Sequence, residues 1–163
     1  MKVVVLLGSD SDFEVVQEAL EVLKEFGVSY QLEVSSAHRS PERTLRLVRE
    51  TEAAGAEVYI AVAGKAAHLA GVVAAHTVRP VIGVPVDSAA LSGLDALLST
   101  VQMPKGIPVA TMGLGKMGGT NAALLAVEIL SLGDPGLKDK LLAYRARLAA
   151  QVEASSAKLR QKL

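Results

Sequence analysis

The feature that most restricts the fold of this chain is a repeated alternation between short β-branched runs and longer segments with helical spacing of apolar residues. Such alternation is typical of parallel strands joined by crossover helices. The chain is 163 residues long and shows no internal repeat, low-complexity tract or linker. We therefore expect a single α/β domain over residues 1–163, which is long enough to bury one sizeable core.

Five strands and six helical segments are predicted from this pattern. The strands are expected near residues 3–7, 30–34, 58–62, 81–84 and 109–111, and the helices near 12–26, from 41 onward, and near 66–77, 94–101, 120–130 and 135–161. Five parallel strands with helices on both faces form a flavodoxin-like three-layer sandwich. Ligands bind such sheets beyond the carboxyl ends of the strands, so a functional site is expected in the loops there.

Composition disfavours several classes of function. Lys and Arg together number 17, as do Asp and Glu, so no net positive charge attracts nucleic acid or an anionic membrane surface. The chain contains no cysteine, which excludes disulfides and thiolate metal sites. The sequence has no apolar run long enough to span a membrane and no signal-peptide pattern. We expect a soluble, cytoplasmic protein.

The chain is apolar for a small soluble monomer. Hydrophobic residues make up 50% of it and charged residues 21%, and its mean hydropathy is +0.35. We therefore expect subunit contacts to bury part of the surface, with the long C-terminal helix near 135–161 packing on a neighbouring subunit. Aromatic residues are only 3% and Trp is absent, which disfavours an electron carrier that holds a flavin.

The first loop at the expected carboxyl edge reads GSDSD, residues 8–12. Ser9 and Ser11 offer hydroxyls, and the N-terminus of the following helix offers free N–H groups to an anion. Asp12 can cap that helix end, or its carboxylate can accept hydrogen bonds from sugar hydroxyls. Both interpretations, capping and ligand binding, are open from these residues alone.

The second loop is part of the stretch SSAHRSPER, residues 35–43, in which Pro41 fits the first turn of the next helix. Ser36, His38 and Arg39 combine a hydroxyl, an imidazole that exchanges protons near neutral pH, and a cation. This combination predicts a phosphate-binding site beside an acid–base group. The alternative is a helix cap by Ser40 with an incidental histidine and arginine, although capping does not require a His-Arg pair.

The third loop opens the stretch AGKAAHLAG, residues 63–71, whose glycines permit close approach of the backbone to a ligand. Lys65 follows Gly64, but no Ser or Thr comes next, so a nucleotide P-loop is not indicated. His68 begins an apolar helical segment and is at least as readily a buried core histidine as a ligand. No acidic cluster accompanies the histidines, so we expect no metal.

A glycine-rich segment, MGLGKMGGTNAALLA, occupies residues 112–126. Gly113, Gly115 and Gly118 have the local spacing of a dinucleotide-binding loop. That loop normally follows the first strand, whereas this segment comes after the fifth expected strand. No acidic residue about 20 positions on closes a second βαβ unit here. The segment is therefore not interpreted as a cofactor site.

Six segments together resemble one known family in order and spacing. They are GSDSD, SAHRSPER, AGKAAHLAG, RPVIGVPV, LSGLDALLSTVQMPKGIPVAT and NAALLA. They are similar to the PurE family of purine biosynthesis, the catalytic subunit of phosphoribosylaminoimidazole carboxylase, over nearly the whole chain to about Leu130. The resemblance implies N5-carboxyaminoimidazole ribonucleotide mutase activity, an isomerisation that moves a carboxylate from N5 to ring C4 without ATP, metal or organic cofactor.

The resemblance also implies roles for individual residues and an assembly. His38 matches the catalytic histidine, and the small-molecule ribonucleotide substrate is the implied partner. The positions that the resemblance marks as substrate-binding are Ser9, Asp12, Ser36, Arg39, Gly64, Lys65, Ala66, His68 and Leu69. Ser9 and Asp12 match residues that hold the ribonucleotide, and Ser36 and Arg39 match phosphate ligands. Family members resemble flavodoxin-type homo-octamers with sites near subunit contacts.

This chain departs from the usual mutase pattern at two positions. Lys65 stands where glycine is usual and Ala70 where proline is usual, and AVAGK is similar to the AVAGR of the branch that uses CO₂ directly. His68 and the segment VQMPKGIPVAT are similar to the mutase branch, which we favour. Two alternatives stay open: direct carboxylation of aminoimidazole ribonucleotide by CO₂, and a non-catalytic flavodoxin-like domain that binds a phosphorylated ligand.

Overall fold

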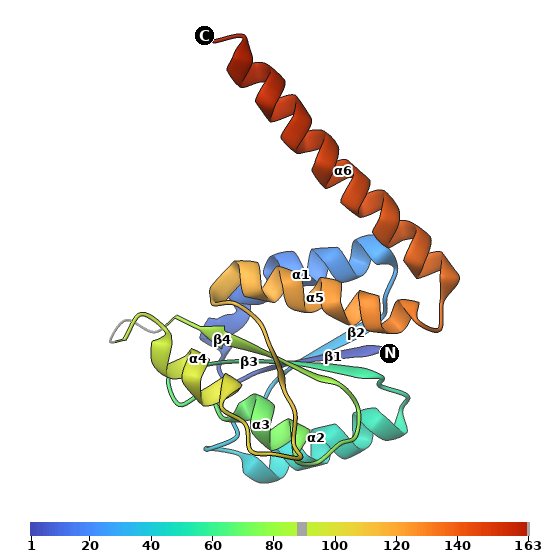
Figure 1. The fold of residues 1–163 in the computed structure, drawn as a ribbon. Coiled ribbons are helices and arrows are strands. Elements are labelled where there is room, and N and C mark those ends of the chain that lie inside the picture. The colour runs from blue at the N-terminus through green and yellow to red at the C-terminus, as the bar shows by residue number, and fades with distance from the viewer. Residues whose placement is uncertain (88–90, 163) are drawn as a thin grey trace. The chain divides into compact units, whose positions relative to one another are not determined.

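The computed structural model describes residues 1–87 and 91–162. In these residues five parallel strands form one sheet in the order β2-β1-β3-β4-β5 (Figure 1). The strands are β1 (Val3–Leu7), β2 (Tyr30–Val34), β3 (Val58–Gly64), β4 (Val81–Val86) and β5 (Ala110–Thr111). This order is the flavodoxin-like one, which confirms the predicted fold class.

The interior strand β1 explains why the sheet could be recognised in the sequence. All five of its residues, VVVLL, are buried, and strands that are covered on both faces read as continuous apolar runs. Val3 pairs with Tyr30 of β2 on one side and with Val58 of β3 on the other. The carboxyl ends of β1, β2 and β3 therefore lie next to one another at one edge of the sheet.

Helices cover both faces of the sheet (Figure 1). α1 (Phe13–Phe26) lies on one face, and α2 (Pro41–Ala53), α3 (Leu69–Ala74) and α4 (Leu94–Val101) lie on the other. The first part of α5 (Gly115–Ser131) lies beside α1. α1 ends at Gly27, whose φ of 74° is in the left-handed region that favours glycine.

A core of aliphatic side chains fills the space between the sheet and the helices α2 and α3. Tyr59 is fully buried in it, and its hydroxyl donates a hydrogen bond of 3.0 Å to the carbonyl of Val48. The same hydroxyl lies 2.9 Å from Thr51 Oγ1. Burial raises the pKa of this phenol. A buried tyrosine thus keeps its polar group satisfied inside the layer.

The prediction of one helix over residues 66–77 is wrong in extent, because α3 covers only Leu69–Ala74. Before it, the N–H of Ala67 donates to the carbonyl of Lys65 and the N–H of His68 to that of Ala66, each at 2.8 Å. Bonds to the residue two positions earlier belong to tight turns and not to an α-helix, which bonds four positions back. The segment before α3 is therefore a turn at the carboxyl edge of the sheet.

Residues Met1–Ala126 form one compact unit and residues from Val127 onward form a second. The second contains α6 (Pro135–Arg160), which confirms the predicted long C-terminal helix. Its N-terminus is capped by Asp134, whose side chain accepts from the N–H groups of Gly136 and Leu137 at 2.9 and 3.3 Å. Across the described part of the chain, none of the helices has the length and apolar character needed to cross a bilayer.

Candidate functional site

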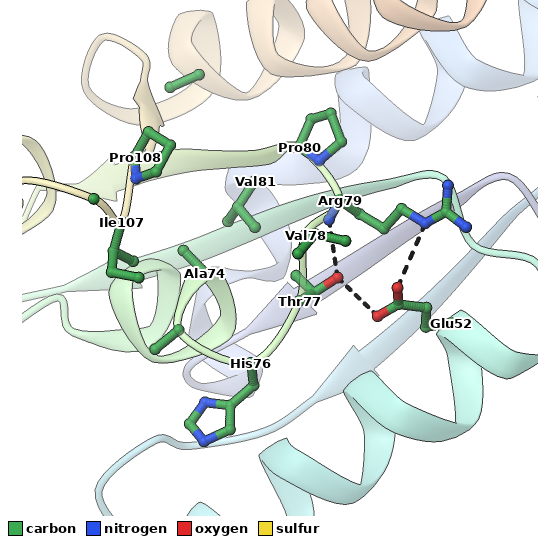
Figure 2. Close-up of a pocket in the computed structure, with 13 residues that line it drawn as sticks. Glu52, Ala74, His76, Thr77, Val78, Arg79, Pro80, Val81, Ile107 and Pro108 are labelled. Atoms are coloured by element: carbon green, nitrogen blue, oxygen red, sulfur yellow. Dashed lines mark hydrogen bonds and ion pairs between the residues drawn. The ribbon is translucent and has the colours of Figure 1, made fainter.

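Among the pockets on the described surface, two lie at opposite edges of the sheet. The larger, of about 920 Å³, lies at the amino ends of β4 and β5 (Figure 2). Its polar groups are paired with one another, because Thr77 Oγ1 donates to Glu52 Oε2 at 2.8 Å and Arg79 Nε lies 3.5 Å from Glu52 Oε1. Most of the remaining lining is apolar. The charges of this pocket are thus compensated within the protein.

The second pocket, of about 660 Å³, lies at the carboxyl ends of β1, β3 and β4 and is also lined by the loop after β2. The structure brings all ten predicted site residues to its lining: Ser9, Asp12, Ser36, His38, Arg39, Gly64, Lys65, Ala66, His68 and Leu69. This is the edge at which ligands bind in open parallel sheets. We therefore take this pocket as the candidate site.

The loop after β1 forms a single turn of 3₁₀-helix, Asp10–Asp12, with a reciprocal cap. Ser9 Oγ accepts from the N–H of Ser11 at 3.4 Å, and Asp12 Oδ2 accepts from the N–H of Ser9 at 3.0 Å. Asp12 is only 8% exposed, and this burial raises the pKa of its carboxyl above the ordinary value of 3.8. Asp12 therefore caps the turn and also lines the pocket, so the two interpretations are compatible.

The loop after β2 holds Arg39 against the loop after β1. Arg39 donates from its backbone N–H and Nε to Ser36 Oγ at 3.2 and 3.4 Å, and from Nη2 to the carbonyl of Gly8 at 3.3 Å. Ser40 does not cap α2, because its hydroxyl donates to the carbonyl of Ser36 and makes no capping bond. The capping alternative for this loop is therefore wrong. The N-terminus of α2 is left beside an exposed cation.

His38 and His68 meet across the pocket, although they come from different loops and are 30 residues apart. His38 Nε2 lies 2.8 Å from His68 Nδ1, and the rings pack edge to face with centroids 4.9 Å apart and planes at 79°. His68 is exposed, so its interpretation as a buried core histidine is wrong. One nitrogen must donate and the other accept, which couples the tautomers of the two rings.

The loop after β3 supplies the opposite wall of the pocket with Gly64, Lys65 and Ala66. Lys65 has a φ of 55°, in the left-handed region that side chains disfavour. Among the residues that line the pocket, Lys65 and Arg39 are the cations, and Asp12 and Asp87 carry the carboxyls. The site thus combines two positive groups with two imidazoles, which suits an anionic ligand and a proton transfer.

Two lining residues with polar side chains, Ser11 and Asp87, are not among the predicted site residues. Asp87 follows β4 directly, but the predicted strand ends at residue 84, two positions before the observed end at Val86. A longer strand prediction would have placed Asp87 at the carboxyl edge. From the sequence, Ser11 is noted only for its hydroxyl group. In the structure that hydroxyl donates a hydrogen bond of 3.0 Å to Ser9 Oγ.

Two of the glycines in residues 112–126, Gly118 and Gly119, have a packing role. A Cβ at Gly118 would lie 1.8 Å from the carbonyl oxygen of Gly113, and one at Gly119 would lie 2.5 Å from that of Val15 in α1. Glycine is thus required where backbones approach closely. Elsewhere, in residues 1–87 and 91–162, no three His, Cys, Asp or Glu side chains gather as a set that could hold a metal ion.

Comparison with known proteins agrees with this geometry. Residues 2–151 match the family described as AIR carboxylase. The chain is 51% identical over 157 residues to an N5-carboxyaminoimidazole ribonucleotide mutase of Methanocaldococcus jannaschii, covering 96% of each chain. It is 58% identical over 144 residues to the mutase of Pyrococcus abyssi, covering 88% of this chain and 82% of that one.

Similarity extends to solved structures. The crystal structure of Treponema denticola PurE aligns with a TM-score of 0.88 at 32% identity, covering 96% of this chain and 97% of that one. A second crystal structure, of a substituted form of Treponema denticola PurE2, aligns with a TM-score of 0.89 at 31% identity, covering 98% and 99% of the two chains. The match in sequence and structure over nearly its whole length shows that the chain belongs to the AIR carboxylase, or PurE, family.

Proposed function

We propose that this protein is an N5-carboxyaminoimidazole ribonucleotide mutase of de novo purine biosynthesis. The names of its relatives support the proposal. The structural observation that carries it is the position of His38, whose ring lies 2.8 Å from His68 in a pocket that also contains Arg39 and Asp12. An acid–base group beside an anion site is what a carboxylate transfer on a ribonucleotide requires.

The pocket offers complementary groups to each part of this substrate. The phosphate pairs with the guanidinium of Arg39, the hydroxyl of Ser36 and the N–H groups at the start of α2. The ribose hydroxyls bond to Asp12 and Ser9 at the end of β1. The loop after β3, through Gly64, Ala66 and Leu69, lies against the imidazole ring of the substrate. Binding of both ends fixes the reacting atoms relative to His38, which is a proximity effect.

His38 then serves both halves of the reaction. The protonated ring donates its proton to N5 as the bond between N5 and the carboxyl carbon breaks and CO₂ is released into the pocket. Ring C4 of the substrate attacks the carbon of CO₂, forming the new bond. The C4 proton passes to His38, which restores the aromatic ring of the substrate and the starting protonation of the enzyme. Atoms and charge balance without ATP, metal or organic cofactor, so the net change is an isomerisation.

His68 positions His38 in this scheme. Because its Nδ1 lies 2.8 Å from His38 Nε2, a proton on one nitrogen is matched by a lone pair on the other. The same contact holds the His38 ring at the mouth of the pocket, where both residues are exposed. His68 also lies on the loop that contacts the substrate, which is consistent with a binding role.

We propose in addition that the protein assembles as a homo-octamer in the cytoplasm, with no nucleic-acid or membrane partner. Exposed apolar side chains support self-association, among them Leu94, Leu98 and Val101 along α4 and Leu142, Leu148, Val152 and Leu159 along α6. The spacing on α4 forms one stripe of a helix face. Native mass spectrometry of the purified protein tests the assembly, and a stable monomer at micromolar concentration would contradict it.

A two-substrate assay without ATP tests the activity. The purified protein receives either N5-carboxyaminoimidazole ribonucleotide or aminoimidazole ribonucleotide with CO₂, and formation of 4-carboxy-5-aminoimidazole ribonucleotide is followed. The proposal predicts efficient turnover of the first substrate. Preference for aminoimidazole ribonucleotide with free CO₂ would show a direct carboxylase instead, and turnover of neither would show a binding domain.

A further inference from the structure

The backbone of Lys65 adopts a conformation that lysine disfavours. Its φ is 55°, directly after the last residue of β3. A side chain with a Cβ is strained in the left-handed region, whereas glycine adopts it freely. Such strain is typically found at functional sites, where the surrounding structure holds the residue in place. The position therefore raises the question of what the lysine side chain contributes there.

Contacts within the chain do not account for the lysine. Lys65 is exposed at the pocket wall, and its ammonium group makes neither a hydrogen bond nor an ion pair with residues 1–87 or 91–162. By contrast, the guanidinium of Arg39 is held by Ser36 and by the carbonyl of Gly8 at 3.3 Å. One cation of the pocket is thus fixed by the protein, and the other is available to a ligand.

The two cations lie on different walls of the pocket. Arg39 comes from the loop after β2 and is tied to the loop after β1, whereas Lys65 comes from the loop after β3, three residues before His68. The His38–His68 contact joins these walls. The substrate under the proposed function carries two anionic groups at opposite ends, a phosphate on the ribose and a carboxylate on the base.

We infer that the ammonium group of Lys65 binds the migrating carboxylate of the substrate, which leaves Arg39 to the phosphate. This inference rests on the proposed function and assigns the substrate group that Lys65 recognises. A cation beside the carboxylate also stabilises it in the product, after the carboxylate has moved to C4. The strained lysine is then retained for ligand binding and not for folding.

Binding of two ribonucleotides that differ in the carboxylate tests this assignment. Isothermal titration of 4-carboxy-5-aminoimidazole ribonucleotide and of aminoimidazole ribonucleotide gives the ratio of their Kd values. In Lys65→Gly we expect affinity for the carboxylated ligand to fall by about 10-fold or more, with affinity for the other unchanged. Lys65→Arg should keep most of the preference. Lys24→Ala, which removes an exposed lysine of α1, is the control for loss of one charge.

Chemical unfolding of the same variants tests the strain. Glycine relieves the left-handed conformation, so Lys65→Gly should unfold at the same or a higher denaturant concentration than the wild-type protein. An equal loss of affinity for both ribonucleotides would assign Lys65 to the phosphate and overturn the inference. A Lys65→Gly variant with unchanged preference, or with clearly lower stability, would also overturn it.

Failure of the inference and failure of the proposed function give different results. If the wild-type protein turns over N5-carboxyaminoimidazole ribonucleotide while Lys65→Gly keeps the carboxylate preference, the mutase function is supported and the assignment of Lys65 to the carboxylate is contradicted. If the wild-type protein turns over neither substrate while Lys65→Gly loses the carboxylate preference, the assignment of Lys65 to the carboxylate is supported and the mutase function is contradicted.

Discussion

Replacement of His68 by phenylalanine tests whether this residue positions His38 or takes part in proton transfer itself. Phenylalanine fills the space of the imidazole but removes the contact of 2.8 Å between His68 Nδ1 and His38 Nε2. While His38 is neutral, between the two proton transfers, a hydrogen bond of this kind contributes about 0.5–1.5 kcal/mol. At about 1.4 kcal/mol for each factor of ten, its loss lowers kcat/KM by about 2- to 12-fold. Loss of a general acid or base lowers the rate by about 10²–10⁴-fold.

The assay is steady-state turnover of N5-carboxyaminoimidazole ribonucleotide, combined with ¹⁵N NMR of the His38 ring. His68→Phe should show the modest loss and a changed distribution of His38 tautomers. His68→Asn should restore part of both, because its side-chain amide can accept a hydrogen bond through the oxygen or donate one through the nitrogen. His76→Phe is the matched control, since His76 bonds the carbonyl of Val72, away from this pocket. A loss of 100-fold or more in His68→Phe, or no change, would refute the positioning role.

Two further predictions concern stability. Burial in the folded protein raises the pKa of Asp12 above 3.8, so the folded state holds this proton to a higher pH than the unfolded state does. The free energy of unfolding should therefore fall as the pH rises from below 3.8 through the raised pKa of Asp12. In Asp12→Asn this pH-dependent fall in stability should be missing. Urea unfolding of the variant and the wild-type protein at a series of pH values measures it, and parallel pH profiles of the two proteins would contradict the prediction. Gly118→Ala should lower the free energy of unfolding by about 1–3 kcal/mol, because the added methyl group clashes with the carbonyl oxygen of Gly113. Gly113→Ala is the control and should change stability little, because the space around Gly113 is open. Equal unfolding midpoints for the two variants would contradict the packing role of Gly118.

The sheet could be predicted because its interior strands β1, β3 and β4 are mostly buried and read as nearly continuous apolar runs, whereas the edge strands β2 and β5 are partly exposed. The carboxyl ends of β3 and β4 could not be predicted, because Gly64 and Pro85 have low strand propensity. The parallel ladder nevertheless continues through them, with Ala63 opposite Pro85 and Gly64 opposite Val86. Pairing with a neighbouring strand thus extends an element beyond what its own residues favour.

Part of the candidate site, in the loops after β1 and β2, could be predicted from loop positions, because the carboxyl ends of parallel strands converge in space. The positions in the loop after β3 are predicted from the family resemblance. The contact between His38 and His68 could not, since it joins residues 30 positions apart and depends on the path of the loop after β3. The mostly apolar residues of that loop favour a helix in the sequence. Its tight turn and the left-handed Lys65 depend on tertiary context, which a periodic pattern does not contain.

Turnover by His38→Asn is the most direct measurement of the central claim, that the imidazole at this pocket transfers the proton in both halves of the reaction. Asparagine retains a polar side chain of similar reach but does not exchange a proton near neutral pH. We predict that kcat falls by about 10²–10⁴-fold or more while the ribonucleotide still binds with a Kd close to that of the wild-type protein. Turnover by His38→Asn at the wild-type rate would contradict the account.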